Sequence, residues 1–580
     1  MLKTLAKSIR EFKTPSIITP ILIIGEVVIE CLIPYIIANL INDIKAGCDF
    51  STILTNGGIM ALLAVLSLSF GAAAAITASK ASAGFARNLR HDLFYKIQTY
   101  SFDNIDKFSS SSLVTRMTTD VANVQMSYMM IIRTAIRSPF MFIFAIFMAY
   151  TMGGALSTIF VVAVPILAFG LFFIARKAMP AFTRLFRKYD RLNESIEENV
   201  MAMRAVKGFV REEYEKEKFT DASDEIRRDF TRAERIVAFN NPLMQVCLQL
   251  IMIFVLYFGS KLIVTSSGSY IDVGQLSAML TYGMQILMSL MMLSMIYVMI
   301  TMSAESARRI VEVLNEEPTL KNPENPITEV KDGSIHFENV SFKYSRRAEK
   351  YALSDIDLHI RSGETVGIIG GTGSSKSTLV QLISRLYDAT EGVVRVGGVD
   401  VREYDMNVLR DSVSVVLQKN VLFAGTVKEN LRWGNKNATD EELEEACRLA
   451  QADAFIKALP DGYDTHIEQG GTNVSGGQKQ RLCIARALLK RPKILILDDS
   501  TSAVDTKTDA LIRRGLKEFI PETTKIIIAQ RVASVEDADK ILVMDGGRIV
   551  AEGTHEELLK SSPIYFEVYT QQTKGGRENA

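Results

Sequence analysis

Hydrophobic and polar positions follow two different patterns along this chain. Over the first half, long apolar runs are separated by charged segments, and six of the runs reach the roughly 20 residues that a helix needs to cross a bilayer. The charged segments hold few glycines or prolines, so we expect the helices to continue beyond the apolar zone. The pattern predicts an all-α, six-helix membrane domain over residues 1–312. The apolar runs lie near residues 16–41, 57–80, 129–150, 154–175, 240–262 and 275–302.

Basic residues predict how these helices are oriented. They gather between the second and third runs and between the fourth and fifth, whereas the opposite loops carry almost none. Because Lys and Arg favour the cytosolic side, we expect a protein of the cell membrane with two long cytosolic helical hairpins. Both termini would then lie on the cytosolic side of that membrane. Residues 1–13 are amphipathic and basic, which predicts a helix along the membrane surface. The basic loop residues are Lys80, Arg87, Arg90, Lys96, Arg176, Lys177, Arg184, Arg187, Lys188 and Arg191.

Two features within the predicted spans are unusual. Glu26 and Glu30 are four residues apart, so they share one face of the first helix. They indicate either a binding point for cationic substrates or a tilted helix that carries them to the outer interface. The sixth run is rich in methionine, which suits an adaptable ligand surface and also ordinary helix packing. These residues are Met279, Met284, Met288, Met291, Met292, Met295, Met299 and Met302.

The pattern changes after residue 312. Pro318, Pro323 and Pro326 end the last helix and predict a linker over residues 313–332. From residue 333 to 580, short apolar strands alternate with helical segments, which predicts an α/β domain. The polar end, Thr573–Ala580, predicts a disordered tail.

A phosphate loop follows the predicted strand Thr365–Ile369 and precedes a predicted helix. In this context backbone N–H groups and the helix N-terminus converge on phosphates, while Lys376 bridges two of them and Ser377 ligates Mg²⁺. Ser375 replaces the usual glycine, which introduces modest strain if the position needs a positive φ. The predicted ATP-binding residues here are Gly370, Gly371, Thr372, Gly373, Ser374, Ser375, Lys376, Ser377 and Thr378.

Two further motifs follow in order. Val474–Gln478 reads Val-Ser-Gly-Gly-Gln and opens a helix, and the apolar run Ile494–Leu497 ends in Asp498 and Asp499. With the phosphate loop, this trio resembles the ATP-binding cassette (ABC) family, and the likeness extends from Met1 to about Gln572. The resemblance implies a P-loop NTPase fold that binds ATP and Mg²⁺. It also implies two cytosolic segments, Ser109–Asp120 and Gly208–Phe219, that rest on the nucleotide domain.

The resemblance assigns roles to further residues. Tyr344 would stack on adenine, and Mg²⁺ would be held by Ser377, Gln418 and, through water, Asp498. Asp505 would lie in the loop Ser502–Asp505, which crosses the dimer interface in the family. The helix-opening motif cannot reach this chain's own phosphate loop, so it would close over ATP bound to a second subunit. It comprises Ser475, Gly476, Gly477 and Gln478.

Two positions depart from the family pattern. Asp499 stands where the family has a catalytic Glu, and Gln530 stands where it has a His. The shorter Asp retreats by roughly 1 Å, a displacement that can lower a rate about 10²-fold. Gln donates a hydrogen bond but carries no proton near neutral pH. We therefore expect a degenerate site, with Asp499 and Gln530 at the catalytic positions, that binds ATP and hydrolyses it slowly.

Three functions agree with these residues. The first is one subunit of a heterodimeric multidrug exporter, which moves hydrophobic or amphipathic compounds and whose partner supplies the Glu and the His. The others are a homodimeric exporter or lipid flippase with a slow Asp499, and an ATP-gated channel or regulatory subunit. Equal numbers of acidic and basic residues, 66 each, give no net field that points to nucleic acid. The five cysteines have no metal-ligand spacing and imply no disulfide framework.

Overall fold

The computed structural model describes residues 1–580 except 267–268, 346–347, 500–503 and 578–580. The chain folds into two compact units. One consists of Met1–Thr99 and Phe108–Glu316, and the other of Tyr100–Lys107 and Glu317–Ala580. The first is helical and the second is α/β, so the two classes predicted from the hydropathy pattern are confirmed.

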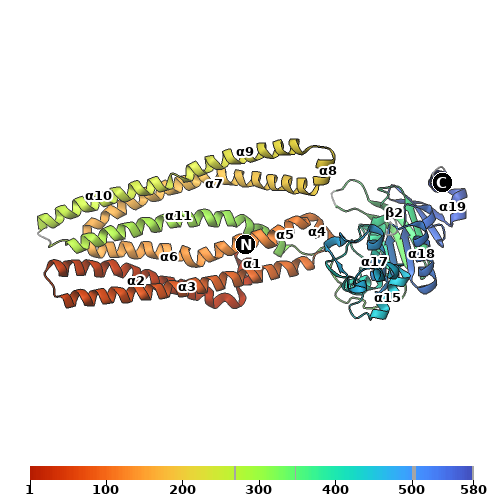
Figure 1. Ribbon diagram of the computed structural model, residues 1–580, viewed down its shortest axis with the longest axis horizontal. Helices are drawn as coiled ribbons and strands as arrows, with labels where there is room; N and C mark the ends of the chain where they lie inside the picture. The colour runs from red at the N-terminus through yellow and green to blue at the C-terminus, as the bar shows by residue number, and fades with distance from the viewer. Residues whose placement is uncertain (267–268, 346–347, 500–503, 578–580) are drawn as a thin grey trace. The chain divides into compact units, whose positions relative to one another are not determined.

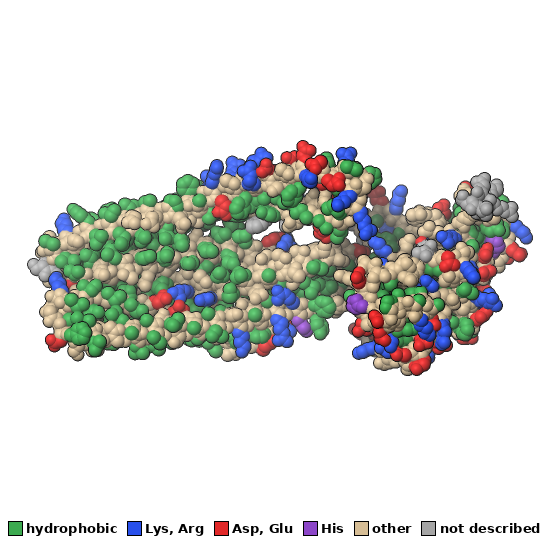
Figure 2. Space-filling view, in the orientation of Figure 1, with side chains coloured by type: hydrophobic (Ala, Val, Ile, Leu, Met, Phe, Trp, Pro, Cys, Tyr) green, Lys and Arg blue, Asp and Glu red, His purple; other side chains and the backbone are tan. Residues whose placement is uncertain are grey.

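Long helices lie side by side in the helical unit (Figure 1). Five of the six predicted apolar runs fall within one of them, and the run 154–175 begins in the turn before α7. Hydrophobic side chains predominate at the left of the visible face of these helices, whereas Lys, Arg, Asp and Glu gather over α8 (Met203–Gly208) and α9 (Glu212–Val237) (Figure 2). Because α6 and α7 join through the short turn η3 (Gly154–Ser157), the described residues form five continuous helical segments that are long and apolar enough to cross a membrane. The long helices are α2 (Lys13–Lys45), α3 (Phe50–Gln98), α6 (Val121–Gly153), α7 (Thr158–Met201), α10 (Asn240–Ser266) and α11 (Val273–Asn315).

The N-terminal residues form two short pieces, α1 (Leu2–Ala6) and η1 (Lys7–Phe12), before α2 begins. Arg10, with a φ of 40°, kinks the chain within η1. Arg10 pairs with Asp92 of α3 at 2.5 Å, and the Ser8 hydroxyl donates to the same carboxylate at 2.7 Å. The N-terminal segment is therefore held against the cytosolic part of α3 by its polar residues.

Arg137 of α6 pairs with both acidic residues of the first span. Its Nη1 donates to Glu26 Oε1 at 2.5 Å, and its Nη2 donates to the Glu30 carboxylate at 2.7 Å. Glu30 lies about 16 Å before the end of the apolar run at residue 41, which is half the thickness of a bilayer core of about 30 Å. This position argues against the interface explanation. The sequence prediction missed this partner, although Arg137 was visible, together with Arg133, within the run 129–150.

The methionines of α11 differ in their environment. Met279 is fully buried beside Gly153, whereas Met284, Met288 and Met295 are 51%, 41% and 62% exposed on this chain. Packing within the chain therefore accounts for Met279. The exposed methionines on the surface of the helical unit are Met284, Met288, Met292, Met295 and Met302.

The first cytosolic connection contacts the nucleotide unit through α4 (Phe102–Phe108) and the residues just before it. Ser101 Oγ accepts from the Leu320 N–H at 3.0 Å, and Asp106 accepts from the Tyr387 hydroxyl at 3.1 Å. These residues belong to the nucleotide unit by their contacts. The predicted segment, Ser109–Asp120, follows one helix later, and its role as a segment that rests on the nucleotide domain stays a prediction. Two short polar helices adjoin here, and only tertiary contacts distinguish them.

The segment Ser109–Asp120 belongs to the helical unit. It forms α5 (Ser110–Thr115) and the π-helical turn η2 (Arg116–Asp120). The carboxylate of Asp120 is completely buried, and Arg309 of α11 donates two hydrogen bonds to it, at 2.5 and 2.8 Å. Arg116 likewise donates to Glu312 at 3.0 Å. This network ties the start of α6 to the end of α11.

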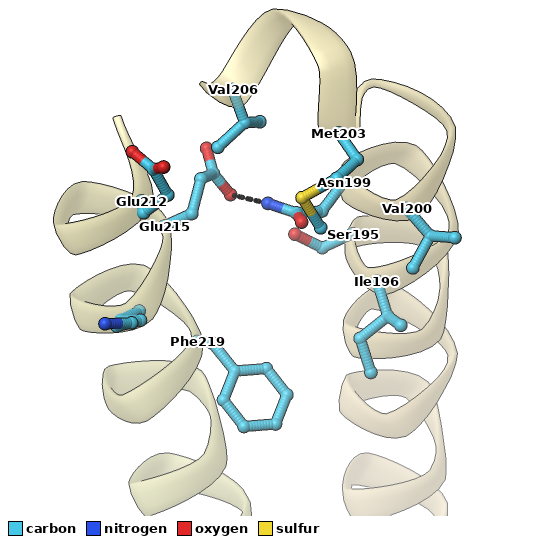
Figure 3. Close-up of a pocket in the computed structure, with 10 residues that line it drawn as sticks. Ser195, Ile196, Asn199, Val200, Met203, Val206, Glu212, Glu215 and Phe219 are labelled. Atoms are coloured by element: carbon cyan, nitrogen blue, oxygen red, sulfur yellow. Dashed lines mark hydrogen bonds between the residues drawn. The ribbon is translucent and has the colours of Figure 1, made fainter. Parts of the chain in front are cut away.

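The second cytosolic hairpin is built from α7, α8 (Met203–Gly208) and α9 (Glu212–Val237). Figure 3 shows that α7 and α9 run beside one another below α8, with the Asn199 amide donating to Glu215 at 2.8 Å. Between them lies an open cavity of about 500 Å³. At the tip, Phe209 and Val210 are 80% and 82% exposed, and Val210 has a φ of 51°, which is strained for a β-branched residue.

The nucleotide unit contains two main sheets. In the six-stranded sheet the order is β12-β11-β3-β10-β9-β6, and its central strands are parallel. In the four-stranded antiparallel sheet the order is β2-β1-β4-β5. The strands are β1 (Ile335–Phe342), β2 (Leu353–Ile360), β3 (Thr365–Gly370), β4 (Glu391–Val396), β5 (Val399–Asp400), β6 (Val413–Val416), β7 (Gly425–Thr426), β8 (His466–Ile467), β9 (Ile494–Asp498), β10 (Thr524–Ile528), β11 (Lys540–Asp545) and β12 (Arg548–Gly553).

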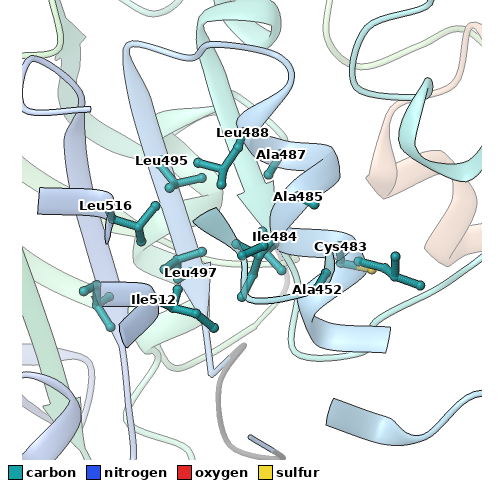
Figure 4. Close-up of a cluster of buried hydrophobic side chains, with 14 of the residues drawn as sticks. Ala452, Cys483, Ile484, Ala485, Ala487, Leu488, Leu495, Leu497, Ile512 and Leu516 are labelled. Carbon is teal, nitrogen blue, oxygen red and sulfur yellow. The ribbon is translucent and has the colours of Figure 1, made fainter. Parts of the chain in front are cut away.

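Helices α17 and α18 pack on the buried strand β9. Figure 4 shows Ile484, Leu488, Ile512 and Leu516 around Leu495 and Leu497, all of them buried. Burial of each such side chain contributes about 1.5–3 kcal/mol, so this cluster fixes the end of β9 firmly. The helices of the unit are α12 (Lys376–Ile383), α13 (Met406–Ser412), α14 (Val427–Leu431), α15 (Asp440–Leu449), α16 (Asp453–Lys457), α17 (Gly476–Leu488), α18 (Thr506–Phe519), α19 (His555–Ser561) and α20 (Pro563–Arg577).

Candidate nucleotide site

Four parallel strands bring the candidate residues to one edge of the six-stranded sheet. Strand β3 leads into the phosphate loop, β9 into Asp498 and Asp499, β10 toward Gln530, and β6 toward Gln418. The carboxyl ends of parallel strands meet at one edge, which is where such sheets bind ligands. The residues line a pocket of about 440 Å³. Its wall also contains three residues of α20 that were not predicted: Ile564, Tyr565 and Val568.

The phosphate loop depends on backbone conformations that favour glycine. Gly373 has a φ of 84°, and a Cβ on Gly370 would lie 2.2 Å from the Met544 carbonyl oxygen of β11. Ser375 has a φ of 68° and precedes the first residue of α12. The predicted strain at Ser375 is therefore present, since left-handed backbone costs a residue with a Cβ about 1–2 kcal/mol.

Replacing Ser375 with glycine should relieve that strain. We expect Ser375→Gly to raise the free energy of unfolding of the nucleotide unit by about 0.5–1 kcal/mol, because glycine adopts this φ freely but loses more entropy on folding. Thermal unfolding of the purified chain measures the change. Ser375→Ala, which retains a Cβ, is the matched control, and an equal gain from both variants would contradict the explanation.

Lys376 lies inside the loop. Its Nζ donates to the carbonyl oxygens of Gly370 and Gly371, both at 2.8 Å, and to Ser374 Oγ at 3.2 Å. Burial lowers the pKa of Lys376, and the nearby carboxylates of Asp498 and Asp499 oppose that effect. The ammonium is thus held among oxygen atoms at the place where the loop would receive phosphates.

Asp498 is 6% exposed at the end of β9, and Ser377 hydrogen-bonds to its carboxylate. Burial raises the pKa of Asp498; the Ser377 hydroxyl opposes the shift, and the charge of Asp499 adds to it. A hydroxyl and a carboxylate, with the Gln418 amide on the wall of the same pocket, form an oxygen donor set. Such a set suits a hard cation such as Mg²⁺.

Asp499 is held by two amides. Its Oδ2 accepts from Gln530 Nε2 at 2.9 Å and from Gln418 Nε2 at 3.4 Å. Burial raises the pKa of Asp499, although these two hydrogen bonds lower it. The residue has a φ of 47°, an outlier of the kind found at functional sites. The structure thus brings together Gln418, Asp499 and Gln530 from three different strands.

Tyr344 lies two residues after β1 and is 49% exposed. Its hydroxyl is 2.9 Å from Thr378 Oγ1, and its ring packs edge-on against Tyr387, with centroids 5.3 Å apart. Tyr387 is 7% exposed and also contacts the ring of Phe102, at 6.0 Å. Tyr387 therefore touches both the tyrosine beside the pocket and the segment around α4, a link that no motif indicated.

Ser475–Gln478 forms a capping box at the start of α17. Ser475 Oγ accepts from the Gln478 N–H at 3.3 Å, and Gln478 Oε1 accepts from the Ser475 N–H at 2.9 Å. Ser475 and Gly476 are exposed, and in the described part of the chain these residues do not line the phosphate pocket. Asp505 caps α18 by accepting from the Thr508 N–H at 3.0 Å. Ser502 and Ala503 lie outside the described residues.

Comparisons with known proteins agree with this arrangement. The family described as "ABC transporter transmembrane region" matches residues 16–291, and the family described as "ABC transporter" matches residues 353–502. The chain belongs to the ABC transporter family. Two relatives share its full organisation: the uncharacterized ABC transporter ATP-binding protein YfiB of Bacillus subtilis, and Rv1273c of Mycobacterium tuberculosis. The first is 35% identical over 560 residues (97% of this chain, 96% of YfiB), the second 37% over 546 residues (93% of each).

The fold also matches a solved structure titled "Structure of a bacterial Atm1-family ABC exporter with ATP bound". The TM-score is 0.84 and the identity 24%, and the match covers 97% of this chain and 98% of the other. This ABC transporter has the organisation of a half-transporter, with one helical membrane domain and one nucleotide-binding domain. It is a multi-pass membrane protein with a cytosolic nucleotide domain, and its transport is coupled to an ATPase. Half-transporters of this family act as dimers, with a partner half-transporter or with a second copy.

Proposed function

We propose that this chain is the degenerate subunit of a heterodimeric ABC exporter for hydrophobic or amphipathic compounds, including drugs. The observation that carries the proposal is the environment of Asp499. Its short carboxylate is held between Gln418 and Gln530, at 3.4 and 2.9 Å, and no histidine stands beside it in the described residues. This arrangement retains the groups that bind phosphate and lacks both the reach and the proton carrier expected for fast hydrolysis.

In this proposal ATP binds to the phosphate loop of this chain, with its adenine against Tyr344. Ser377, Gln418 and Asp498 would hold Mg²⁺, which neutralises phosphate charge when bound. Lys376 would transfer its hydrogen bonds from the loop carbonyls to phosphate oxygens. Asp499 would orient water, but from too far away for rapid attack.

Exposed residues outside the phosphate pocket would meet the partner subunit. Ser475 and Gly476 are exposed at the start of α17, where a helix N-terminus offers N–H groups to an anion. In the proposed heterodimer, Ser475–Gln478 completes the competent site on the partner's phosphate loop, and Asp505 lies close to the interface. This chain would therefore contribute more to hydrolysis through its signature motif than through its own carboxylate.

Two cytosolic segments would carry the movement to the membrane helices. The first is Tyr100–Lys107, which packs on the nucleotide unit through Tyr387. The second is the exposed hairpin tip around Phe209 and Val210, within the predicted segment Gly208–Phe219. Closure of two ATP-bound cassettes would switch the helices to the outward-facing state, and hydrolysis in the competent site would reset them.

One observation favours a second candidate function, a slow homodimeric exporter or lipid flippase. Burial raises the pKa of Asp499, which makes its carboxylate a stronger base than an exposed aspartate. If Asp499 is sufficient, the chain purified alone should hydrolyse ATP, and Asp499→Asn should abolish that activity. A chain that is inactive alone and active only with a different half-transporter supports the heterodimer.

Two variants test the proposed division of labour in the transporter purified from its native membrane. Lys376→Ala should weaken ATP binding at the degenerate site and lower the ATPase rate only a few-fold. Ser475→Ala should lower the rate about 10²-fold, because it removes a group that contacts ATP on the partner during reaction. ATPase assays at saturating ATP measure both.

Ser475 also caps α17, so its substitution needs a structural control. Loss of a serine cap costs about 1 kcal/mol, and Ser475→Asn retains a capping oxygen. The melting temperature of Ser475→Asn should equal that of the native chain while its ATPase rate stays low. Equal small effects of Lys376→Ala and Ser475→Ala would contradict the assigned pairing.

A further inference from the structure

The last helix of the chain, α20, contacts the segment that carries Gln530. Gln572 of α20 makes two hydrogen bonds to the main chain of that segment. Its Oε1 accepts from the Val532 N–H at 2.9 Å, and its Nε2 donates to the Gln530 carbonyl oxygen at 2.8 Å. Gln572 also lies beside Asp499 and Gln530 in the lining of a second cavity, which adjoins the nucleotide pocket.

These two hydrogen bonds fix the main chain on both sides of Arg531. Within the described residues, the Gln530 carbonyl and the Val532 N–H both find their partner in Gln572. Gln530 itself is exposed, so the surrounding core does not hold it. Its side chain donates to Asp499 at 2.9 Å. A single side chain of α20 therefore sets the backbone from which Gln530 reaches the carboxylate.

Helix α20 is itself firmly placed. Tyr565 is completely buried, and its hydroxyl is 2.7 Å from His555 Nδ1 of α19. Ile564 and Val568 form part of the wall of the nucleotide pocket. Because the start of α20 packs on the core and the helix is continuous, Gln572, two turns further along, is held in place as well.

We propose that Gln572 is a positioning residue for hydrolysis at this chain's own nucleotide site. By holding the main chain at Gln530 and Val532, it directs the Gln530 amide toward Asp499. The inference rests on the proposed function only in that Asp499 and Gln530 form the reaction centre of this site. It assigns a role in that site to the C-terminal helix, which lies beyond every motif of the cassette.

The test uses the transporter purified with its native partner and a photo-crosslinkable ATP analogue trapped with orthovanadate. Label on this chain, separated from the partner by size, reports hydrolysis at its own phosphate loop. Gln572→Met keeps the length of the side chain and removes both hydrogen bonds. We expect the rate of labelling at saturating analogue to fall about tenfold, because misplacement of catalytic groups by 1 Å can cost about 10²-fold. The analogue concentration for half-maximal labelling should change less than about twofold.

Gln571→Met is the matched control. Gln571 is the preceding residue of α20 and donates only to Glu567 of the same helix, at 3.2 Å. Its labelling rate should equal that of the native chain. Gln572→Glu should give an intermediate rate, because a carboxylate still accepts from the Val532 N–H but cannot donate to the Gln530 carbonyl.

A double-variant cycle separates positioning from a general structural role. In a Gln530→Ala background, the side chain that Gln572 positions is absent, so Gln572→Met should lower the rate no further. An equal fold-loss in both backgrounds, a similar loss in Gln571→Met, or a lower melting temperature that accounts for the loss would overturn the proposal. Fast labelling of the native chain would contradict the degenerate site. The labelling rate of Gln572→Met relative to the native chain could still be measured, so failure of the proposed function and failure of the positioning role are distinguishable.

Discussion

Lengthening Asp499 to glutamate should raise ATP hydrolysis at this chain's site by about 10²-fold. The carboxylate now lies between Gln418 and Gln530. One further methylene moves it roughly 1 Å toward the pocket, and a displacement of a catalytic group by about 1 Å can change the rate of reaction about 10²-fold. Adding Gln530→His should raise the rate further, because an imidazole can carry a proton near neutral pH. The φ of 47° at residue 499 opposes part of the gain, since aspartate adopts this region more readily than glutamate.

Trapped nucleotide on this chain measures the change, with the same photo-crosslinkable analogue. Asp499→Asn is the control: it keeps the short side chain, removes the charge, and should fall below the native rate. If Asp499→Glu binds the analogue normally and its rate does not rise, side-chain length is not what limits this site. The degenerate-site proposal would then lose its physical basis.

Removing the charge of Arg137 should destabilise the helical unit. In Arg137→Met, Glu26 and Glu30 would keep two carboxylates at the middle of the membrane without a cation between them. Breaking a buried pair costs about 3–5 kcal/mol, and we expect about 3 kcal/mol here because the three side chains are 14–34% exposed. The melting temperature of the purified transporter in detergent, and its yield, should both fall.

The triple variant Glu26→Gln, Glu30→Gln, Arg137→Met removes all three charges together. Its stability should lie close to that of the native chain, because replacing a complete buried ion pair is often neutral. A triple variant as unstable as Arg137→Met would mean that packing, rather than the unpaired carboxylates, explains the loss. A stable triple variant with altered transport would instead connect the charges to the substrate.

Much of the architecture follows from the order of residues along the chain. Six apolar runs and their basic flanks predict the helical unit, because the bilayer imposes length and the cytosol attracts Lys and Arg. The phosphate loop, Asp498 and the apolar runs before them predict β3 and β9 within one residue of their observed ends. At Ser375 the sequence shows only that strain arises if the position needs a positive φ, and the structure supplies that φ of 68°.

The remainder depends on contacts between residues that are far apart in sequence. Arg137 reaches Glu26 across 111 positions, and Tyr387 reaches Asp106 across 281. Nothing in a local pattern distinguishes α4 from α5, or marks Gln572 as different from Gln571. Such pairings depend on which helix packs on which, and hydrophobic periodicity specifies only that some face must be covered.

The buried Asp120 limits how this transporter can change shape. Its carboxylate is completely buried, so moving Arg309 away would leave a buried carboxylate without its ion-pair partner, which is energetically costly. The cytosolic ends of α6 and α11 must then move together. Helix α11 ends at Asn315, just before the chain enters the nucleotide unit. A movement of the nucleotide domain at that junction would therefore displace α6 and α11 together. The helices that move relative to one another during transport must then be separated at other contacts in the bundle.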